Sequence, residues 1–304
     1  MLILFGSALA LAKMSIPFTI ARSIKRRISA LGYITTDEKL EPETIDGISD
    51  CLTRGVSDLS VQALNRFTVR LNRKVFNRAV RRDFFYGAIR IRKLNNAARC
   101  LLLNNEASAW ALTTCYYASF FCAVELLRCS GTFITYLTEE QIQSILERSQ
   151  VPPVGARLET GTYEGIAKYD SATEEVSIAF VKRNIRHHAF TWTQIKEIIK
   201  ESGRSVTGVD ATIQRRLEQF MGQESGPAWP SPSDVRNFWN YEQSSHFGAP
   251  GEKICGTFKK LLITRGSALK WGAGQTAYPG HDIKAAAMAF IMNVLGSWNF
   301  KKYQ

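Results

Sequence analysis

Apolar residues recur every three or four positions along most of this chain, a spacing that predicts a mainly α-helical fold. One long helical region is expected over residues 57–94. Residues 106–131 are apolar or small nearly throughout, which predicts a central helix that is buried on all sides. The remaining predicted helices begin after Thr191 and cover residues 211–222 and 281–300. We therefore expect a helical bundle.

A different period runs through residues 158–183, where TYEGIAKY and EEVSIAFVKR alternate apolar and polar positions around the turn DSAT. Two alternating runs of this length predict a β-hairpin. Because two strands alone do not make a stable domain, we expect this hairpin, around residues 160–183, to be a small insertion in the helical domain.

The stretch SPSDVRNFWNYEQSSHFG, residues 231–248, carries a strong helix-start signal. Ser231 stands at the cap, Pro232 at the first helical position and Asp234 at the third. The helix is expected to run to about residue 244, because a Gly and a Pro follow. The spacing of three residues predicts its buried face: Val235, Phe238 and Trp239.

Four polar side chains gather beside that buried face, and they are our candidate catalytic residues: Arg236, Asn237, Asn240 and Tyr241. Arg236 has no acid within one turn on its own face. Its partner is therefore either a carboxylate from another helix, such as Glu125, or an external phosphate. The structural alternative for the whole cluster is hydrogen bonding between helices of a bundle.

The charge of the chain changes this picture, because 304 residues carry a formal net charge of +12 with a pI of about 9.5. Such a balance favours RNA or another polyanion as partner. Residues 66–99 hold 11 Lys or Arg against the single acid Asp83. On one helix six of these cations would form a stripe about 140° wide, namely Arg66, Arg70, Arg73, Lys74, Arg78 and Arg81, and a solvated face is the alternative. We predict five nucleic-acid-binding residues from it: Arg66, Arg70, Arg73, Arg78 and Arg81.

The six cysteines contain no C-x-x-C pair and no Cys/His cluster, so no metal site is predicted. Cys115, Cys122 and Cys129 recur every seven residues, as buried small side chains on one side of a helix do. This usage favours a reducing, cytoplasmic compartment. No Walker loop, G-x-G-x-x-G, G-x-S-x-G or H-E-x-x-H is present, so we expect no cofactor.

The N-terminal region is expected to form a separate part, residues 1–56, ahead of the helical domain at 57–304. It begins with the apolar run MLILFGSALALA, which is too short to span a bilayer and has no basic residues before it, so we expect no stable membrane span. Residues 1–13 are read either as an extension upstream of a start at Met14, as a buried helix, or as a membrane-associated segment. A basic amphipathic helix over 14–31 and an acidic linker over 35–47 follow.

A family resemblance rests on the order of these elements: a basic helix, a central helix carrying YYASFFCAVELLRCSG, a helix opened by HHAFTW, and a helix carrying RNFWNY. This order resembles the HEPN (higher eukaryotes and prokaryotes nucleotide-binding) superfamily over about residues 70–245. The central helix fits its Tyr-Tyr-Ala-x-Phe-x-x-Ala-x-x-Leu-Leu pattern through Tyr116, Tyr117, Ala118, Phe120, Ala123, Leu126, Leu127 and Gly131.

The resemblance implies metal-independent RNA cleavage in a homodimer, with an Arg on the phosphate, a polar neighbour orienting it and a His moving the proton of the 2′-hydroxyl. The chain departs from the pattern at the last position, where Tyr241 replaces His. An unperturbed tyrosine, with a pKa of about 10, is a poor general base. His246 lies near the end of the same stretch. A literal match elsewhere, Arg183-Asn184-x-x-x-His188, falls between a predicted strand and a helix, and we interpret it as coincidence.

Three functions remain open on these residues. The first is a HEPN-like endoribonuclease of the toxin or antiviral-defence type, held in check by an inhibitory or complex partner protein. The second is a catalytically silent module that binds RNA or nucleotide or scaffolds a complex. The third is a basic peripheral membrane or protein adaptor that uses the N-terminal apolar run. Arg236 separates them best, because only the first requires it for cleavage.

Overall fold

The computed structural model describes residues 27, 30, 31, 47–53, 58–103, 107–149, 155, 157–202, 207–222, 229–242, 244–274 and 280–296. They divide into two compact units rather than the one domain expected over 57–304. The sheet unit takes its described residues from 27–86 and 124–187, and the helical unit from 87–123 and 188–296. Two long helices, α3 (Arg73–Leu103) and α4 (Ser108–Cys129), contribute residues to both units.

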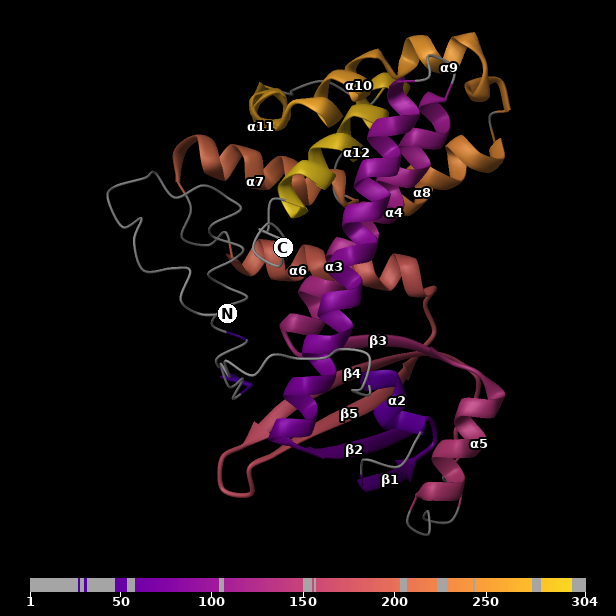
Figure 1. Ribbon diagram of the computed structural model, residues 1–304, viewed down its shortest axis with the longest axis vertical. Coiled ribbons are helices and arrows are strands. Elements are labelled where there is room, and N and C mark those ends of the chain that lie inside the picture. Colours follow the sequence, from indigo (N-terminus) through magenta and orange to yellow (C-terminus); the bar gives the residue numbers. More distant parts are fainter. Residues whose placement is uncertain are drawn as a thin grey trace. The chain divides into compact units, whose positions relative to one another are not determined.

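The sheet unit contains a five-stranded antiparallel sheet in the order β1-β2-β5-β4-β3 (Figure 1). Its strands are β1 (Asp58–Ala63), β2 (Arg66–Asn72), β3 (Thr132–Leu137), β4 (Gly161–Asp170) and β5 (Glu175–Arg183). The predicted hairpin is confirmed as β4 and β5. It is not a separate insertion, however, because β5 pairs with β2 and β4 pairs with β3.

The helix predicted over residues 57–94 is wrong in its first half, because residues 58–72 form β1 and β2. In β2, Phe67, Val69 and Leu71 are buried while the residues between them face outward. This alternation has the strand period of two, and β-branched and aromatic residues favour strands. Asn65, with φ 57°, turns the chain between β1 and β2. The long helix therefore begins only at Arg73.

A ring stack forms the centre of the sheet unit's core. Phe67 and Phe180 lie with their ring centroids 4.7 Å apart and their planes 8° from parallel. Gly165 of β4 pairs with Phe180, and a Cβ at this glycine would lie 2.4 Å from the Phe180 ring. The glycine thus leaves room for the ring to cover the strand. Helices α2 (Ile48–Thr53) and α5 (Glu139–Arg148) complete the unit.

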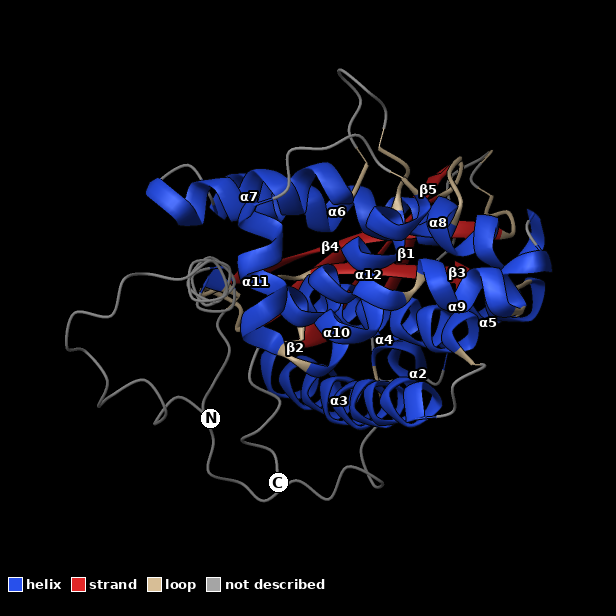
Figure 2. Cartoon of the chain, turned by 90° about the horizontal axis from the view of Figure 1, so that it is seen from above, coloured by secondary structure: helices blue, strands red, loops and turns tan. Residues whose placement is uncertain are grey.

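The helical unit is built around α12 (His281–Leu295), whose residues from Ala285 to Met292 are all buried. It contacts α10, α11 and α7 (Figure 2), and its position and apolar character confirm the predicted last helix. The other elements of this unit are α6 (His187–Ser202), α7 (Gly208–Phe220), α8 (Pro232–Asn237), the π-helix η4 (Phe238–Glu242), the 3₁₀ helix η5 (Ser244–Phe247), α9 (Ala249–Ile254), α10 (Gly256–Ile263) and α11 (Arg265–Gly274).

Helix α6 starts at His187 and not after Thr191, as the sequence had led us to expect. Thr191 is fully buried inside the helix. A buried side chain there cannot act as the exposed cap of a helix that begins beside it. Burial of the apolar residues Phe190 and Trp192, together with Thr191, stabilises this turn as part of the helix.

Helix α4 confirms the predicted central helix; it ends at Cys129, and the chain turns at Gly131, which has φ 81°. Cys115, Cys122 and Cys129 are buried along it, and burial raises the pKa of the Cys115 thiol to about 12. The six cysteines, all within the described residues, form no disulfide. Among the described helices, only α4 is long and apolar enough to cross a membrane, and 78% of its most hydrophobic window is buried within the protein.

The predictions for the N-terminal part fall almost wholly outside the described residues. These are the apolar run at 1–13, the basic helix at 14–31 and the acidic linker at 35–47, of which the structure describes residues 27, 30, 31 and 47.

Candidate functional site

The candidate site begins with the helix start predicted at Ser231, which the structure confirms. Asp234 donates its backbone N–H to the Ser231 hydroxyl at 3.3 Å, and the Asp234 carboxylate accepts the Ser231 N–H at 3.0 Å. Pro232 stands in the first turn. This capping box fixes where α8 begins, and therefore places Arg236 in its second turn.

The helix does not continue as an α-helix to about residue 244. After Asn237 it widens into the π-helix η4, a form that is rare and frequent at functional sites. The wider turn keeps Trp239 fully buried, with its ring centroid 4.2 Å from that of His246, while Tyr241 is 75% exposed. Val235 is also buried, as predicted, whereas Phe238 is only partly buried.

Arg236 is surrounded by three tyrosine rings. Its guanidinium carbon lies 5.3 Å from the centroid of Tyr116, 5.8 Å from that of Tyr117 and 5.9 Å from that of Tyr241. These distances allow cation–π attraction to each ring. Its Nε is buried and has no hydrogen-bond acceptor among the residues that the structure describes.

No carboxylate lies within ion-pair distance of Arg236 in the part of the chain that the structure describes. Glu125, the partner considered from the sequence, instead accepts a hydrogen bond from Arg128 at 3.0 Å. Glu125 belongs to the sheet unit and Arg236 to the helical unit. The tyrosine rings therefore hold the guanidinium without neutralising its charge.

Beside this arginine, Tyr116 joins α4 to α6 and α8. Its hydroxyl lies 2.6 Å from Nδ1 of His188 and 3.5 Å from the hydroxyl of Ser233. Phe120, one turn further along α4, stacks on the His188 ring with centroids 4.1 Å apart and planes 5° from parallel. The His188 imidazole is thus held at its edge by the Tyr116 hydroxyl and on its face by the Phe120 ring.

Burial raises the pKa of Tyr116 above its ordinary value, although the hydrogen bond with Ser233 and the charge of Arg236 act against it. The phenol therefore stays protonated at neutral pH. When the phenol accepts the Nδ1–H of His188 and donates to the Ser233 hydroxyl, Nε2 of the imidazole keeps the free lone pair that can accept a proton.

The remaining candidates stand on the same turn. Asn240 accepts a hydrogen bond through Oδ1 from the Thr113 hydroxyl at 2.7 Å, which ties η4 to α4. Asn237 is half-buried, and its side chain makes no hydrogen bond within the described ranges. The structure thus brings Arg236, Asn240 and Tyr241 to one face of α4, with Asn237 beside them.

The five arginines predicted to bind nucleic acid do not form one helical stripe. Arg66 and Arg70 lie exposed on β2, where Arg70 pairs with Asp58 of β1. Arg73 is bound within the sheet unit, 2.8 Å from the Glu174 carboxylate and 2.8 Å from the Tyr169 hydroxyl. Only two of the five are in the body of α3: Arg78 and Arg81. All five belong to the sheet unit.

Sequence reasoning missed His188 as a site residue. The literal match that included it is split in the structure, because Arg183 is on β5 and binds Glu164 of β4 through Nε at 2.8 Å. His246, the other histidine considered, is buried against Trp239 and does not approach Arg236 through any described contact. The usable signal was the tyrosine pair on the central helix, since Tyr116 meets His188 and Tyr116 and Tyr117 meet Arg236.

No family model, curated protein or solved structure matches this chain. The site is therefore interpreted from its own geometry. Within the described ranges, no three His, Cys, Asp or Glu side chains converge to hold a metal ion. The arrangement offers an uncompensated guanidinium, an oriented imidazole and several amide and hydroxyl groups, which together can bind a phosphate and move a proton near it.

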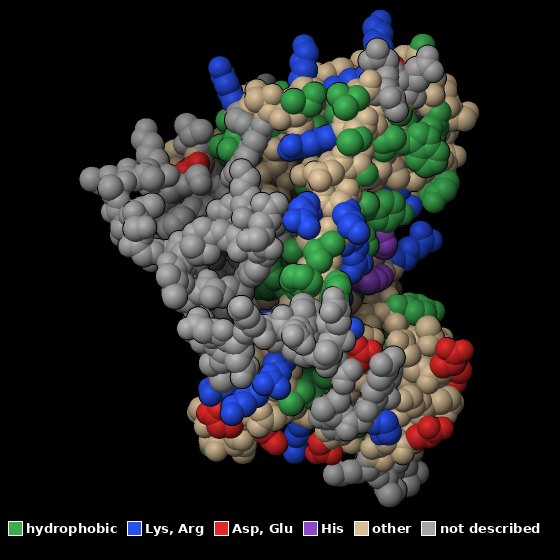
Figure 3. Space-filling view, viewed as in Figure 1, with side chains coloured by type: hydrophobic (Ala, Val, Ile, Leu, Met, Phe, Trp, Pro, Cys, Tyr) green, Lys and Arg blue, Asp and Glu red, His purple; other side chains and the backbone are tan. Residues whose placement is uncertain are grey.

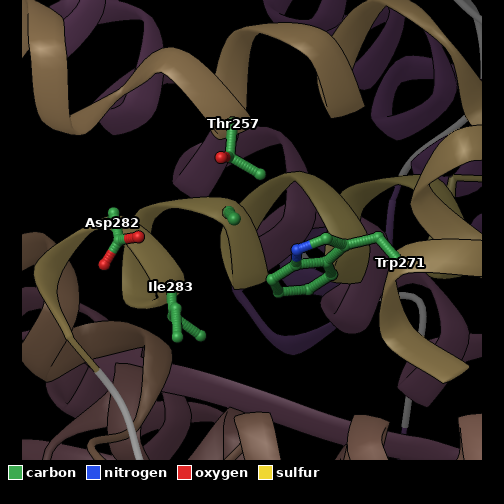
Figure 4. A pocket seen from close by; sticks show the side chains of 5 residues that line it. Thr257, Trp271, Asp282 and Ile283 are labelled. Carbon is green, nitrogen blue, oxygen red and sulfur yellow. The ribbon is translucent and has the colours of Figure 1, made fainter. Parts of the chain in front are cut away.

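A separate cavity of about 240 Å³ lies between α10, α11 and α12 of the helical unit (Figure 4). It is lined by Thr257, Trp271, Asp282, Ile283 and Ala286. It shares no residue with the cluster around Arg236, and its one carboxylate makes it unsuited to a phosphate.

Proposed function

We propose that this protein binds RNA at the cluster around Arg236 and cleaves it by metal-independent attack of a ribose 2′-hydroxyl on the adjacent phosphate. The observation that supports this proposal most is the environment of Arg236. A half-buried guanidinium without a carboxylate partner is costly unless an anion completes it. A phosphate diester is the anion that the fork of a guanidinium fits best.

The proposed chemistry assigns a role to each group. Arg236 donates hydrogen bonds to the non-bridging phosphate oxygens and stabilises the charge that develops on them. His188, oriented by Tyr116, accepts the proton of the 2′-hydroxyl as its oxygen forms the new bond to phosphorus. The bond from phosphorus to the 5′ oxygen then breaks, and that oxygen takes up a proton from water. The products are a 2′,3′-cyclic phosphate and a 5′-hydroxyl. Asn237, Asn240 and Tyr241 position the backbone.

The decisive experiment incubates the purified protein with single-stranded RNA in EDTA and compares Arg236→Ala and Arg236→Lys with the parent. Both variants should lose cleavage while the melting temperature moves by only a few degrees, because Lys cannot reproduce the bidentate fork. Arg215→Ala is the matched control, since Arg215 lies exposed on α7. Cleavage that survives in Arg236→Ala would contradict the proposal.

His188→Gln tests the second role, with His281→Gln as a matched control on an exposed histidine. Loss of cleavage with retained RNA binding in His188→Gln alone would support the imidazole as the proton acceptor. Equal cleavage in the two variants would exclude it.

The second candidate function is a catalytically silent module that binds RNA. The observation that favours it is Tyr241 at the position where the resembled family has its histidine, because a phenol is a poorer general base than an imidazole. RNA binding that depends on Arg236, without any cleavage product, would decide for this function.

A toxin or antiviral-defence effector is the biological role that we propose for a cleaving protein of this kind, with a homodimer and an inhibitory partner as expected companions and the cytoplasm as its compartment. Growth arrest on expression of the parent chain, relieved by Arg236→Ala, would support this role. Equal growth with both chains would contradict it.

A further inference from the structure

The exposed face of α4 carries a line of aromatic side chains. Trp110, Tyr117 and Phe121 are spaced by seven and four residues, so that they fall within a sector of about 40° and extend over about 16 Å of helix. Trp110 is 56% exposed, and Tyr117 and Phe121 are partly exposed. Most other residues of α4 are buried. A line of large aromatic rings on an exposed face indicates an interaction surface.

Cations flank this line on both sides. On one side Arg236 lies 5.8 Å from the Tyr117 centroid, and on the other the guanidinium carbon of Arg90 in α3 lies 4.2 Å from the Phe121 centroid. The charge of Arg99 lowers the pKa of the Cys115 thiol against the larger effect of burial, so Arg99 also acts on α4. All these residues belong to the helical unit.

The α3 residues of the helical unit add further positive charge. Arg90, Arg92, Lys93 and Arg99 are exposed, and none has an ion-pair partner in the described part of the chain. Residues 87–103 and 107–123 contain no Asp or Glu. In Figure 3, Lys and Arg side chains stand over the elements of the helical unit, whereas most of the visible Asp and Glu lie over the sheet unit.

We infer that this aromatic strip, formed by Trp110, Tyr117 and Phe121, is a binding platform for single-stranded RNA that extends the site at Arg236. Single strands are bound by aromatic side chains on which successive bases stack, set in a positively charged groove that follows the backbone. A duplex hides its base faces and cannot use such a strip. The inference rests on the proposed RNA binding at Arg236 and names its substrate class.

Two further rings fit this assignment at the Arg236 end, of which Tyr241 is exposed and Phe247 is half-buried. Tyr241 is 75% exposed and lies 5.9 Å from the guanidinium carbon. Phe247 meets Trp110 edge to face, with centroids 5.1 Å apart. Because the Thr113–Asn240 hydrogen bond fixes η4 on α4, Tyr241 stands at a set position beside the strip, and Phe247 of η5 is held by its contact with Trp110. Bases on both sides of the phosphate at Arg236 therefore find a ring on which to stack.

The test measures binding of a labelled 2′-O-methyl RNA of about 12 nucleotides, a length within the range that such surfaces cover. This RNA has no free 2′-hydroxyl and is not cleaved by the proposed mechanism, so the result is independent of catalysis. The parent should bind the single strand more tightly than the duplex of the same sequence. Trp110→Ala and Phe121→Leu should each weaken single-strand binding by roughly tenfold and leave duplex binding unchanged.

Tyr136→Ala is the matched control, because Tyr136 is also 56% exposed but lies on β3 of the sheet unit. Its affinity should equal that of the parent. Absence of cleavage by the parent, or cleavage that survives in Arg236→Ala, contradicts the proposed reaction but leaves the strip intact if Trp110→Ala still loses affinity.

Two results would overturn the inference. One is equal affinity of Trp110→Ala and the parent for the single strand. The other is self-association measured by sedimentation that Trp110→Ala abolishes without any change in RNA affinity, which would assign the strip to a second copy of this chain.

Discussion

The hydroxyl of Tyr116 lies 2.6 Å from Nδ1 of His188, although 72 positions separate the two residues in the chain. This hydrogen bond joins the central helix α4 to the start of α6 and places an imidazole beside the phenol that also meets Arg236. It turns two separate features of the sequence, a tyrosine pair and a histidine at a helix start, into one arrangement.

Tyr116→Phe tests this hydrogen bond directly. The substitution keeps the ring that faces Arg236 and removes only the hydroxyl, which is bonded to His188 and lies 3.5 Å from the Ser233 hydroxyl. We expect a loss of stability of about 1 kcal/mol, the usual net value of one hydrogen bond, and a much larger loss of RNA cleavage because the imidazole is no longer oriented. Thermal unfolding and cleavage rates measured on the same samples separate the two effects. A cleavage loss no greater than the stability loss would make Tyr116 a packing residue only.

The salt dependence of RNA binding should come from the helical unit. Changing Arg92, Lys93 and Arg99 together to Gln should reduce the slope of log affinity against log salt by about 0.7 for each phosphate that these side chains no longer neutralise. Arg73→Gln is the control, because Arg73 is already paired with Glu174, and its slope should match the parent. If Arg73→Gln reduced the salt slope more than the triple variant did, the RNA-binding face would be assigned to the sheet unit instead.

Gly251→Ala should destabilise the helical unit. A Cβ at Gly251 would lie 1.8 Å from the backbone carbonyl oxygen of His246, so η5 and α9 would have to separate. Overpacking of this kind costs about 1–3 kcal/mol, which chemical denaturation can measure. Gly256→Ala provides the contrast, since nothing lies within 4 Å of a Cβ there. Equal stability of the two variants would contradict the close backbone approach.

The free energy of unfolding should decrease at acidic pH, in part because of His246. Burial lowers the pKa of this histidine, and the nearby His281 lowers it further. The unfolded chain therefore takes up a proton at a higher pH than the folded one. The contribution is fully present above the unfolded pKa of about 6.5 and is lost as the pH falls below it.

The variant His246→Phe should flatten that pH dependence, because phenylalanine has no group that takes up a proton in this pH range. Unfolding free energies measured at pH 7.5 and at about pH 5.5 give the comparison. His281→Gln should keep most of the dependence, since burial, the larger cause, acts on His246 itself. An unchanged pH dependence in His246→Phe would remove this histidine as a cause.

The local parts of the site could be predicted from the sequence, because they depend on neighbours in the chain. The capping box at Ser231 and Asp234 and the burial of Trp239 follow from spacing alone. The π-turn after Asn237 could not, since the same residues fit an α-helix equally well. His188 was also missed, because its role comes from Tyr116 on a distant helix.

The fold shows the same division. The hairpin of β4 and β5 and the helices α4, α7 and α12 could be predicted from their periods. The strands at 58–72 could not be separated from the basic helix that follows. Positive charges occur along both segments, and their spacing is compatible with one continuous helical stripe. Only pairing of β2 with β5 makes Phe67, Val69 and Leu71 a buried strand face.

The pairing of β2 with β5 also has a consequence for how the chain is made. Arg66 pairs with Val181 and Asn72 with Glu175, so roughly 100 residues must leave the ribosome after β2 before its partner exists. Until then β1 and β2 form an isolated hairpin, which is marginal in water. Pairings this far apart in the chain slow folding and leave intermediates exposed. A fragment that ends before Glu175 keeps one edge of β2 open to strands of other chains.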